Sequence, residues 1–132
     1  MDKITFAKIR EIIGFYPEIK LAYLFGSQIR KERGPLSDYD FAIYLDEADP
    51  IKMRDIQFEL HAKIAKVLGQ DKVDVLVLNL TNSPLLRYNV IKDGKVIVER
   101  APHKLLVEPK ILNEYFDFQA ELHKHNLTKA FQ

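Results

Sequence analysis

The chain has 132 residues, of which 47% are hydrophobic and 30% charged, and its formal net charge is +1. This length and composition fit one domain with a single core. The absence of cysteine excludes disulfide frameworks, cysteine nucleophiles and thiolate zinc clusters, and the near-neutral charge excludes a global attraction to nucleic acid. The lack of a long apolar run or a secretory segment favours a cytoplasmic protein.

The N-terminal part predicts a helix followed by a buried strand. Asp2 can cap a helix that runs from Lys3 to about Phe15. The nearly continuous apolar run from Ile19 to Phe25 is typical of a strand that is covered on both faces. A short helix is then expected over Ser27 to Lys31, before a turn at Gly34-Pro35.

The middle of the chain predicts alternating strands and helices. Proline after an aspartate or a serine is a strong start signal for a helix. The expected elements are a strand from Asp38 to Leu45, a helix from Pro50 to Leu68, a strand from Val73 to Leu78, a helix from Pro84 to about Lys92 and a strand from Lys95 to Glu99. The order indicates an α/β fold with a mixed, mainly four-stranded sheet backed by helices, over residues 1–100.

Residues 101–132 are expected to form a C-terminal helical extension. Pro102 and Pro109 bracket a predicted connection, after which Lys110 to about Leu127 reads as an amphipathic helix. Its apolar positions are Ile111, Tyr115, Phe118 and Leu122. These positions could pack on the same domain or dock on a partner, and the sequence favours neither alternative.

The most informative pattern is a Gly-Ser pair followed by two aspartates. Ten residues separate Gly26-Ser27 from Asp38, and Asp40 follows two residues later. Because side chains alternate along a strand, both aspartates share one face, about 7 Å apart along the chain, and Tyr39 points to the other face. Two carboxylates on one face repel each other unless a cation lies between them. Beside a Gly-Ser turn, they suit divalent metal ions that carry a nucleotide triphosphate.

The Gly-Ser-x10-Asp-x-Asp pattern resembles the signature of the DNA polymerase beta-like nucleotidyltransferase superfamily. The short chain and Arg30, which completes a Gly-Ser-x-x-Arg form, are similar to its minimal, MNT-type members. In such proteins a third carboxylate lies on a later strand, and Asp74 occupies that place here. The resemblance covers roughly Leu21 to Glu99 and implies the minimal nucleotidyltransferase fold.

The resemblance also implies a site for two Mg²⁺ ions with ATP as substrate. Asp38 and Asp40 would hold both ions. Asp74 would hold the ion nearer the attacking hydroxyl and could accept its proton. These three aspartates are the predicted catalytic and metal-binding residues.

Four residues are predicted to bind the nucleotide. Gly26 permits close approach of the backbone to the phosphates, and Ser27, with neighbouring N–H groups, can bind their oxygens. Arg30 is a candidate for the leaving phosphates, and Ser37 could touch a phosphate or cap a turn. Three polar residues beyond the third strand could recognise a base or ribose, or simply shape a loop: Asn79, Thr81 and Asn82.

The implied function is that of an antitoxin. MNT-type proteins commonly occur beside HEPN-domain ribonuclease toxins, and members of the family transfer AMP from ATP to a tyrosine hydroxyl of the toxin. One alternative is a transferase for a small molecule such as an aminoglycoside, and another is a non-catalytic antitoxin that neutralises its partner by contact. A pure binder has no need for mutually repelling aspartates. The chain lacks a concentrated basic patch, which argues against a nucleic-acid partner, whereas a hetero-oligomer or a homodimer would fit.

Overall fold

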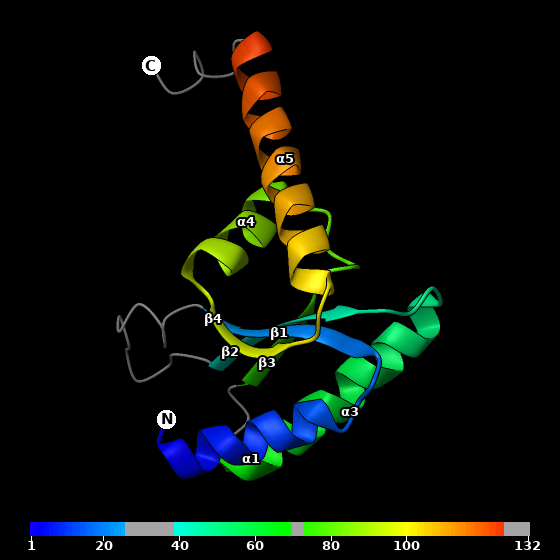
Figure 1. The fold of residues 1–132 in the computed structure, drawn as a ribbon, viewed down its shortest axis with the longest axis vertical. Helices are drawn as coiled ribbons and strands as arrows, with labels where there is room; N and C mark the ends of the chain where they lie inside the picture. Colours follow the sequence, from blue (N-terminus) through cyan, green and yellow to red (C-terminus); the bar gives the residue numbers. More distant parts are fainter. Residues whose placement is uncertain (26–38, 70–72, 126–132) are drawn as a thin grey trace.

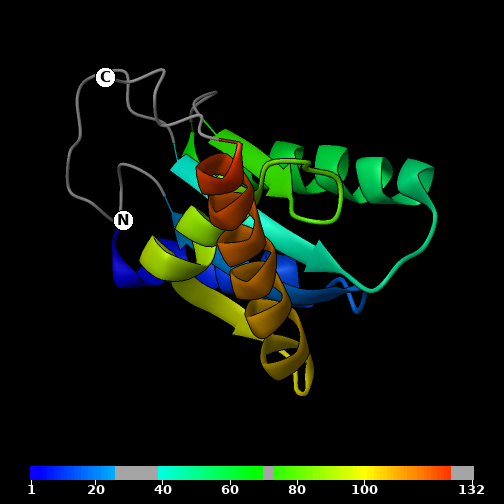
Figure 2. The same ribbon diagram turned by 90° about the horizontal axis from the view of Figure 1, so that it is seen from above.

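One four-stranded mixed sheet organises the chain (Figures 1 and 2). The computed structural model describes residues 1–25, 39–69 and 73–125. Its strands are β1 (Ile19–Phe25), β2 (Tyr39–Leu45), β3 (Val73–Val77) and β4 (Lys95–Glu99). They lie in the order β3-β2-β1-β4, with β1 antiparallel to both neighbours and β3 parallel to β2. The predicted mixed sheet is confirmed.

Two pairs of helices cover the two faces of the sheet (Figure 1). α1 (Lys3–Gly14) and α3 (Pro50–Leu68) lie on one face, and α4 (Pro84–Asp93) and α5 (His103–Lys124) lie on the other. The predicted side-chain caps form at three helix starts: Asp2 accepts from the Thr5 N–H, Asp49 from that of Ile51 and Ser83 from that of Leu86. No described helix has the length and apolar character needed to cross a membrane.

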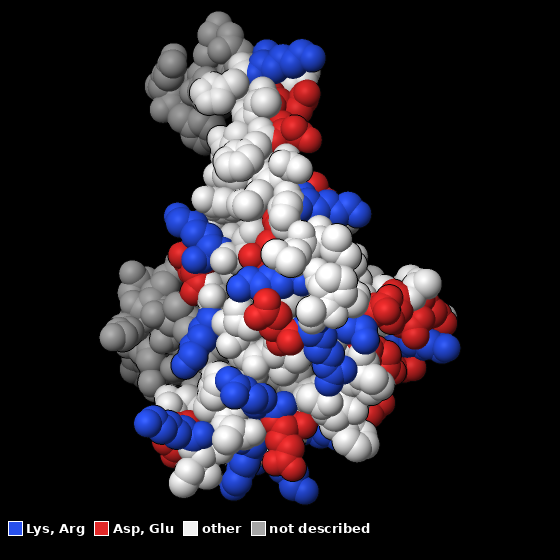
Figure 3. Space-filling model, in the orientation of Figure 1, with Lys and Arg blue, Asp and Glu red and all other residues white. Residues whose placement is uncertain are grey.

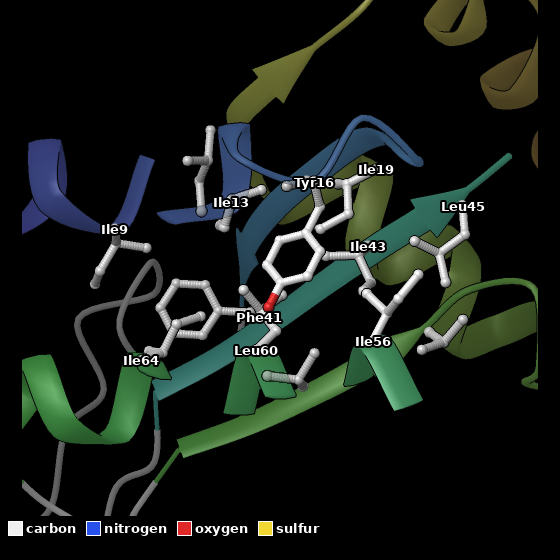
Figure 4. Packing of buried hydrophobic residues seen from close by; sticks show 14 of the residues in the cluster. Ile9, Ile13, Tyr16, Ile19, Phe41, Ile43, Leu45, Ile56, Leu60 and Ile64 are labelled. Carbon is white, nitrogen blue, oxygen red and sulfur yellow. The ribbon is translucent and has the colours of Figure 1, made fainter. Parts of the chain in front are cut away.

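An apolar cluster fills each side of the sheet. Figure 4 shows the larger one, where α1 and α3 meet the sheet; its central members include Ile9, Ile13, Phe41, Ile43, Leu60 and Ile64. The second cluster, under α4 and α5, contains Leu21, Tyr23, Ala42, Leu78, Val90, Val107 and Ile111. Strand residues alternate between the two clusters, as the period of two requires. This alternation sets which face each polar strand residue occupies.

The C-terminal helix begins earlier than the sequence pattern predicts. Pro102 and Pro109 were expected to bracket a connection, but α5 starts at His103 and continues through Pro109. Proline lacks the N–H that would bond to the carbonyl of Leu105. Leu105 is 79% exposed, so this turn of the helix lies at the surface of the molecule. Burial of Val107 against the sheet favours the helical conformation on this side of the proline.

The two halves of α5 have different surroundings. Ile111 is buried in the second cluster, and the Tyr115 ring stacks on Tyr88 of α4 with the centroids 3.9 Å apart. Beyond this point the helix projects past α4 (Figure 1), and Phe116 and Phe118 are 58% and 36% exposed. In Figure 3 the charges on this face alternate in sign without a broad basic area. The first half therefore packs on its own domain, whereas the second half leaves aromatic surface uncovered.

A buried phenol ties α5 to the centre of the sheet. The Tyr23 hydroxyl donates to Glu108 Oε2 at 2.6 Å, although Tyr23 is only 1% exposed. Burial, reinforced by the hydrogen bond to the Glu108 carboxylate, raises the pKa of the Tyr23 phenol well above its ordinary value of 10.0. The unfolded chain releases this proton at lower pH than the folded chain. The contribution of the protonated Tyr23 phenol to the free energy of unfolding is therefore complete below about pH 10 and is lost as the pH rises further.

Replacing Tyr23 with phenylalanine should lower the free energy of unfolding by about 1–2 kcal/mol, because a half-buried carboxylate loses its donor. Urea denaturation at neutral pH measures this difference. Repeating it above pH 10 should narrow the gap between the two proteins, because only the wild type loses the phenol's contribution. Equal stability at neutral pH would contradict the assigned bond.

Candidate active site

Asp40 on β2 and Asp74 on β3 stand opposite each other. Their Cα atoms are partners in the parallel ladder, and Phe25, the last residue of β1, is the partner of Asp40 on its other side. Neighbouring strands lie about 4.8 Å apart. The structure therefore brings together two aspartates that are far apart in the sequence, at the end of the sheet where β1 finishes.

Both aspartates project to the side of the sheet that carries α4 and α5. Ala42 and Leu76, each two residues further along its strand, belong to the apolar cluster on that side, and side chains two apart share a face. Tyr39 packs against the opposite cluster, as predicted. Asp40 is half-buried and Asp74 is exposed, so a ligand from solvent can reach the pair.

The chemistry of this pair suits a hard divalent cation. Carboxylate oxygens are the preferred ligands of Mg²⁺. Within the described ranges, no group of three or more His, Cys, Asp or Glu side chains could hold a metal ion. The predicted ligand Asp38 lies outside the described residues, as do the predicted nucleotide-binding residues Gly26, Ser27, Arg30 and Ser37. The described part of the chain thus supplies two of the three predicted carboxylates.

A hollow of about 340 Å³ borders the free edge of β3, with Asp74 among its lining residues. Phe58 and Arg54 of α3 also line it. Gln57 and His61, which lie one helical turn apart on α3, bond to backbone carbonyls of β3 from the same hollow. Neither residue was predicted to belong to the site. The only available signal was their i, i+4 spacing on a helix that precedes the edge strand.

Asn79 has a structural role that the sequence left open. Its side chain accepts from the Leu45 N–H and donates to the Leu45 carbonyl, both at 2.9 Å. It therefore extends the pairing of β2 beyond the end of β3. Thr81 makes a local loop contact, because its hydroxyl oxygen accepts from the Ser83 N–H at 3.3 Å.

Asn79→Ala should lower the free energy of unfolding by about 1–2 kcal/mol, since two backbone groups of Leu45 lose their partner. Nucleotide affinity, measured by titration well below the melting temperature, should stay within about twofold of the wild type. A selective loss of nucleotide affinity with unchanged stability would instead assign Asn79 to the ligand.

The fold and the opposed aspartates define a small nucleotidyltransferase domain: a mixed sheet, helices on both faces, and carboxylates on adjacent strands beside the end of a third. Comparison with family models agrees. The chain belongs to the polymerase beta nucleotidyltransferase family, whose model, described as "Polymerase beta, Nucleotidyltransferase", matches residues 7–103. It is a nucleotidyltransferase, as the motif predicts.

Individual relatives point to one branch of this family. Protein adenylyltransferase MntA of Aphanizomenon flos-aquae (strain 2012/KM1/D3) is 32% identical over 117 residues, covering 74% of this chain and 72% of the relative. A chain of the toxin–antitoxin MntA-HepT crystal structure is 26% identical, with a TM-score of 0.74 and coverage of 99% of this chain and 100% of that one. A chain from the complex of tri-AMPylated Shewanella oneidensis HEPN toxin with MNT antitoxin is 25% identical, with a TM-score of 0.76 and full coverage of both chains. The predicted resemblance to MNT-type proteins is confirmed.

Proposed function

We propose that this chain transfers AMP from ATP to a tyrosine hydroxyl of a HEPN-type ribonuclease toxin and thereby acts as its antitoxin. The opposed aspartates Asp40 and Asp74 carry the proposal, because nucleotidyl transfer needs anionic ligands for metal ions at the reacting phosphate. The relatives support it: one is named a protein adenylyltransferase, and another is an MNT antitoxin in complex with a tri-AMPylated HEPN toxin. A cytoplasmic location, where ATP is abundant, belongs to the same proposal.

Asp38, Asp40 and Asp74 are the residues that would hold two Mg²⁺ ions. When bound, such ions neutralise charge on the attacking and leaving oxygens. The acceptor oxygen forms a bond to the α-phosphorus, the bond from that phosphorus to the pyrophosphate oxygen breaks, and the hydroxyl proton passes to the Asp74 carboxylate. AMP is then esterified to the acceptor and pyrophosphate is released.

The nucleotide is assigned to the segment between β1 and β2. Gly26 and Ser27 would bind phosphate oxygens through backbone and hydroxyl groups. Arg30 would neutralise the leaving phosphates, and Ser37 would add a further hydroxyl. A relative solved as a toxin–antitoxin with AMP-PNP, 25% identical with a TM-score of 0.76, supports ATP as the substrate.

The acceptor is proposed to arrive on another protein. Asp74 is exposed. All the described helices lie on the one sheet (Figure 2), and the described part of the chain therefore contains no separate acceptor domain. We assign docking of the toxin to the projecting half of α5, where Phe116 and Phe118 are exposed. Helical aromatic side chains of this kind commonly fill a partner's groove.

A ribonuclease assay separates covalent inactivation from neutralisation by contact. The HEPN toxin encoded beside this chain is incubated with the chain and Mg²⁺, with or without ATP. The toxin is then separated from the chain, and its ribonuclease activity is measured. We expect the toxin to stay inactive only after incubation with ATP. Inhibition that needs the bound chain and ignores ATP would indicate a non-catalytic antitoxin. An active toxin under every condition would direct attention to small-molecule acceptors such as aminoglycosides.

A further inference from the structure

The free edge of β3 is held by two side chains of α3. Gln57 Nε2 donates to the Val75 carbonyl at 2.7 Å, and His61 Nε2 lies 2.7 Å from the Val73 carbonyl. A carbonyl oxygen only accepts, so the His61 ring nitrogen carries the proton of that bond. The two bonded residues stand immediately before and after Asp74.

The spacing of these contacts follows from the geometry of the two elements. Residues four apart on a helix are displaced by about 6 Å along its axis, and residues two apart on a strand by about 6.6 Å. One helical turn of α3 therefore matches the distance between the Val73 and Val75 carbonyls. Both side chains can bond at once with α3 lying along the strand.

These bonds restrain a strand that lies at an edge of the described sheet. β3 has five residues, and among the described strands it pairs with β2 alone. The peptide groups of alternate strand residues point to opposite edges, so those of Asp74 point to β2 and those of Val73 and Val75 point away from it. With Gln57 and His61 in place, the backbone is held from both edges around Asp74.

We propose that Gln57 and His61 are positioning residues that fix the Asp74 carboxylate for nucleotidyl transfer. The inference rests on the function proposed for Asp74. Catalytic groups must be held within about 0.5 Å of the productive geometry, and a misplacement of about 1 Å can cost a hundredfold in rate. Neither residue is proposed to touch the reacting atoms; each acts through the backbone of β3.

The variants His61→Leu and Gln57→Met remove one donor each while keeping an apolar side chain of similar size. We expect each to lower kcat for AMP transfer about tenfold, and the double variant about a hundredfold, with KM for ATP within about twofold of the wild type. His61→Gln places an amide donor at a similar reach and should restore kcat to within about threefold of the wild type. Asp55→Asn, an exposed change on the same helix, should leave kcat unchanged.

Two measurements without turnover complete the test. Hydrogen exchange of the Asp74 and Leu76 amides, which point to β2, should accelerate at least about tenfold in the Leu and Met variants. Affinity for Mn²⁺ in the presence of AMP-PNP should weaken about tenfold. Faster exchange with unchanged kcat, or a loss of kcat that His61→Gln fails to restore, would overturn the proposal. If the wild type transfers no AMP, the proposed function fails, and unchanged exchange or unchanged Mn²⁺ affinity then overturns the positioning role separately.

Discussion

Replacing Asp40 with asparagine is expected to lower the rate of AMP transfer to the toxin about a thousandfold. Asparagine keeps the shape of the side chain and removes its charge, so the site loses an anionic ligand opposite Asp74. Metal ions held by such carboxylates supply several kcal/mol of transition-state stabilisation, and about 4 kcal/mol corresponds to a thousandfold. Single-turnover transfer of labelled AMP to purified toxin measures the effect.

The loss of activity must be separated from a loss of structure. Asp40 is the second residue of β2, where it pairs with Phe25 of β1 and Asp74 of β3. At this end of the strand, Asp40→Asn should change the free energy of unfolding by no more than about 1 kcal/mol. Asp55→Asn, at an exposed position of α3, makes the same chemical change away from the site and should retain full activity. An Asp40→Asn protein that keeps more than a tenth of the wild-type rate would contradict the assigned role.

Gly94→Ala is expected to destabilise the protein by about 2–3 kcal/mol, the cost of forcing extra volume into a packed interior. A Cβ at this position would lie 2.2 Å from the Val90 carbonyl oxygen and 3.3 Å from Tyr23 Cβ. The Gly94 N–H bonds to that same carbonyl at 2.7 Å, and Val90 is fully buried, so the backbone has little room to move. Equilibrium urea denaturation measures the change.

The requirement at Gly94 is for space and not for an unusual backbone conformation. Its φ is −75° and its ψ 146°, values that any residue adopts. Gly14→Ala is the matched control: nothing lies within 4 Å of the added Cβ, and the residue ends α1. Alanine favours helix there, so stability should be unchanged or rise by up to about 1 kcal/mol. Equal effects of the two substitutions would refute the steric explanation.

Elements with strong local signals could be predicted from the sequence. α3 begins at the Asp49-Pro50 signal and ends before Gly69, whose φ is 69°. β1 and β4 have the predicted bounds, because each is a short apolar run between residues that favour turns. Helix capping and the alternation of buried and exposed strand residues depend on residues that are close in the sequence. Such local patterns can be read from a single sequence.

Features that depend on tertiary contacts could not be predicted. Tyr23 and Glu108 are 85 residues apart, and no local pattern relates them. The predicted start of the C-terminal helix, at Lys110, was wrong. α5 begins at His103, because burial of Val107 against the sheet outweighs the hydrogen bond that Pro109 cannot make. The hydrogen bonds of Gln57 and His61 could not be predicted either, because they depend on the position of β3 beside α3.

In the candidate site, too, local features could be predicted and tertiary contacts could not. Asp40 and Asp74 were predicted as site residues from motif spacing and element order. Their opposition across a parallel ladder depends on β3 lying next to β2, which the sequence does not specify. Asp38 and the four nucleotide-binding candidates, which lie outside the described residues, stay predictions.

Intact-mass spectrometry of the HEPN toxin after incubation with this chain, ATP and Mg²⁺ tests the central claim most directly. We predict a gain of one AMP mass or a small multiple of it, located on tyrosine by fragmentation, and no gain with the Asp38→Ala/Asp40→Ala variant. An unmodified toxin that is nevertheless bound and silenced by both proteins would contradict the claim, because it would leave the aspartates without a role in neutralisation.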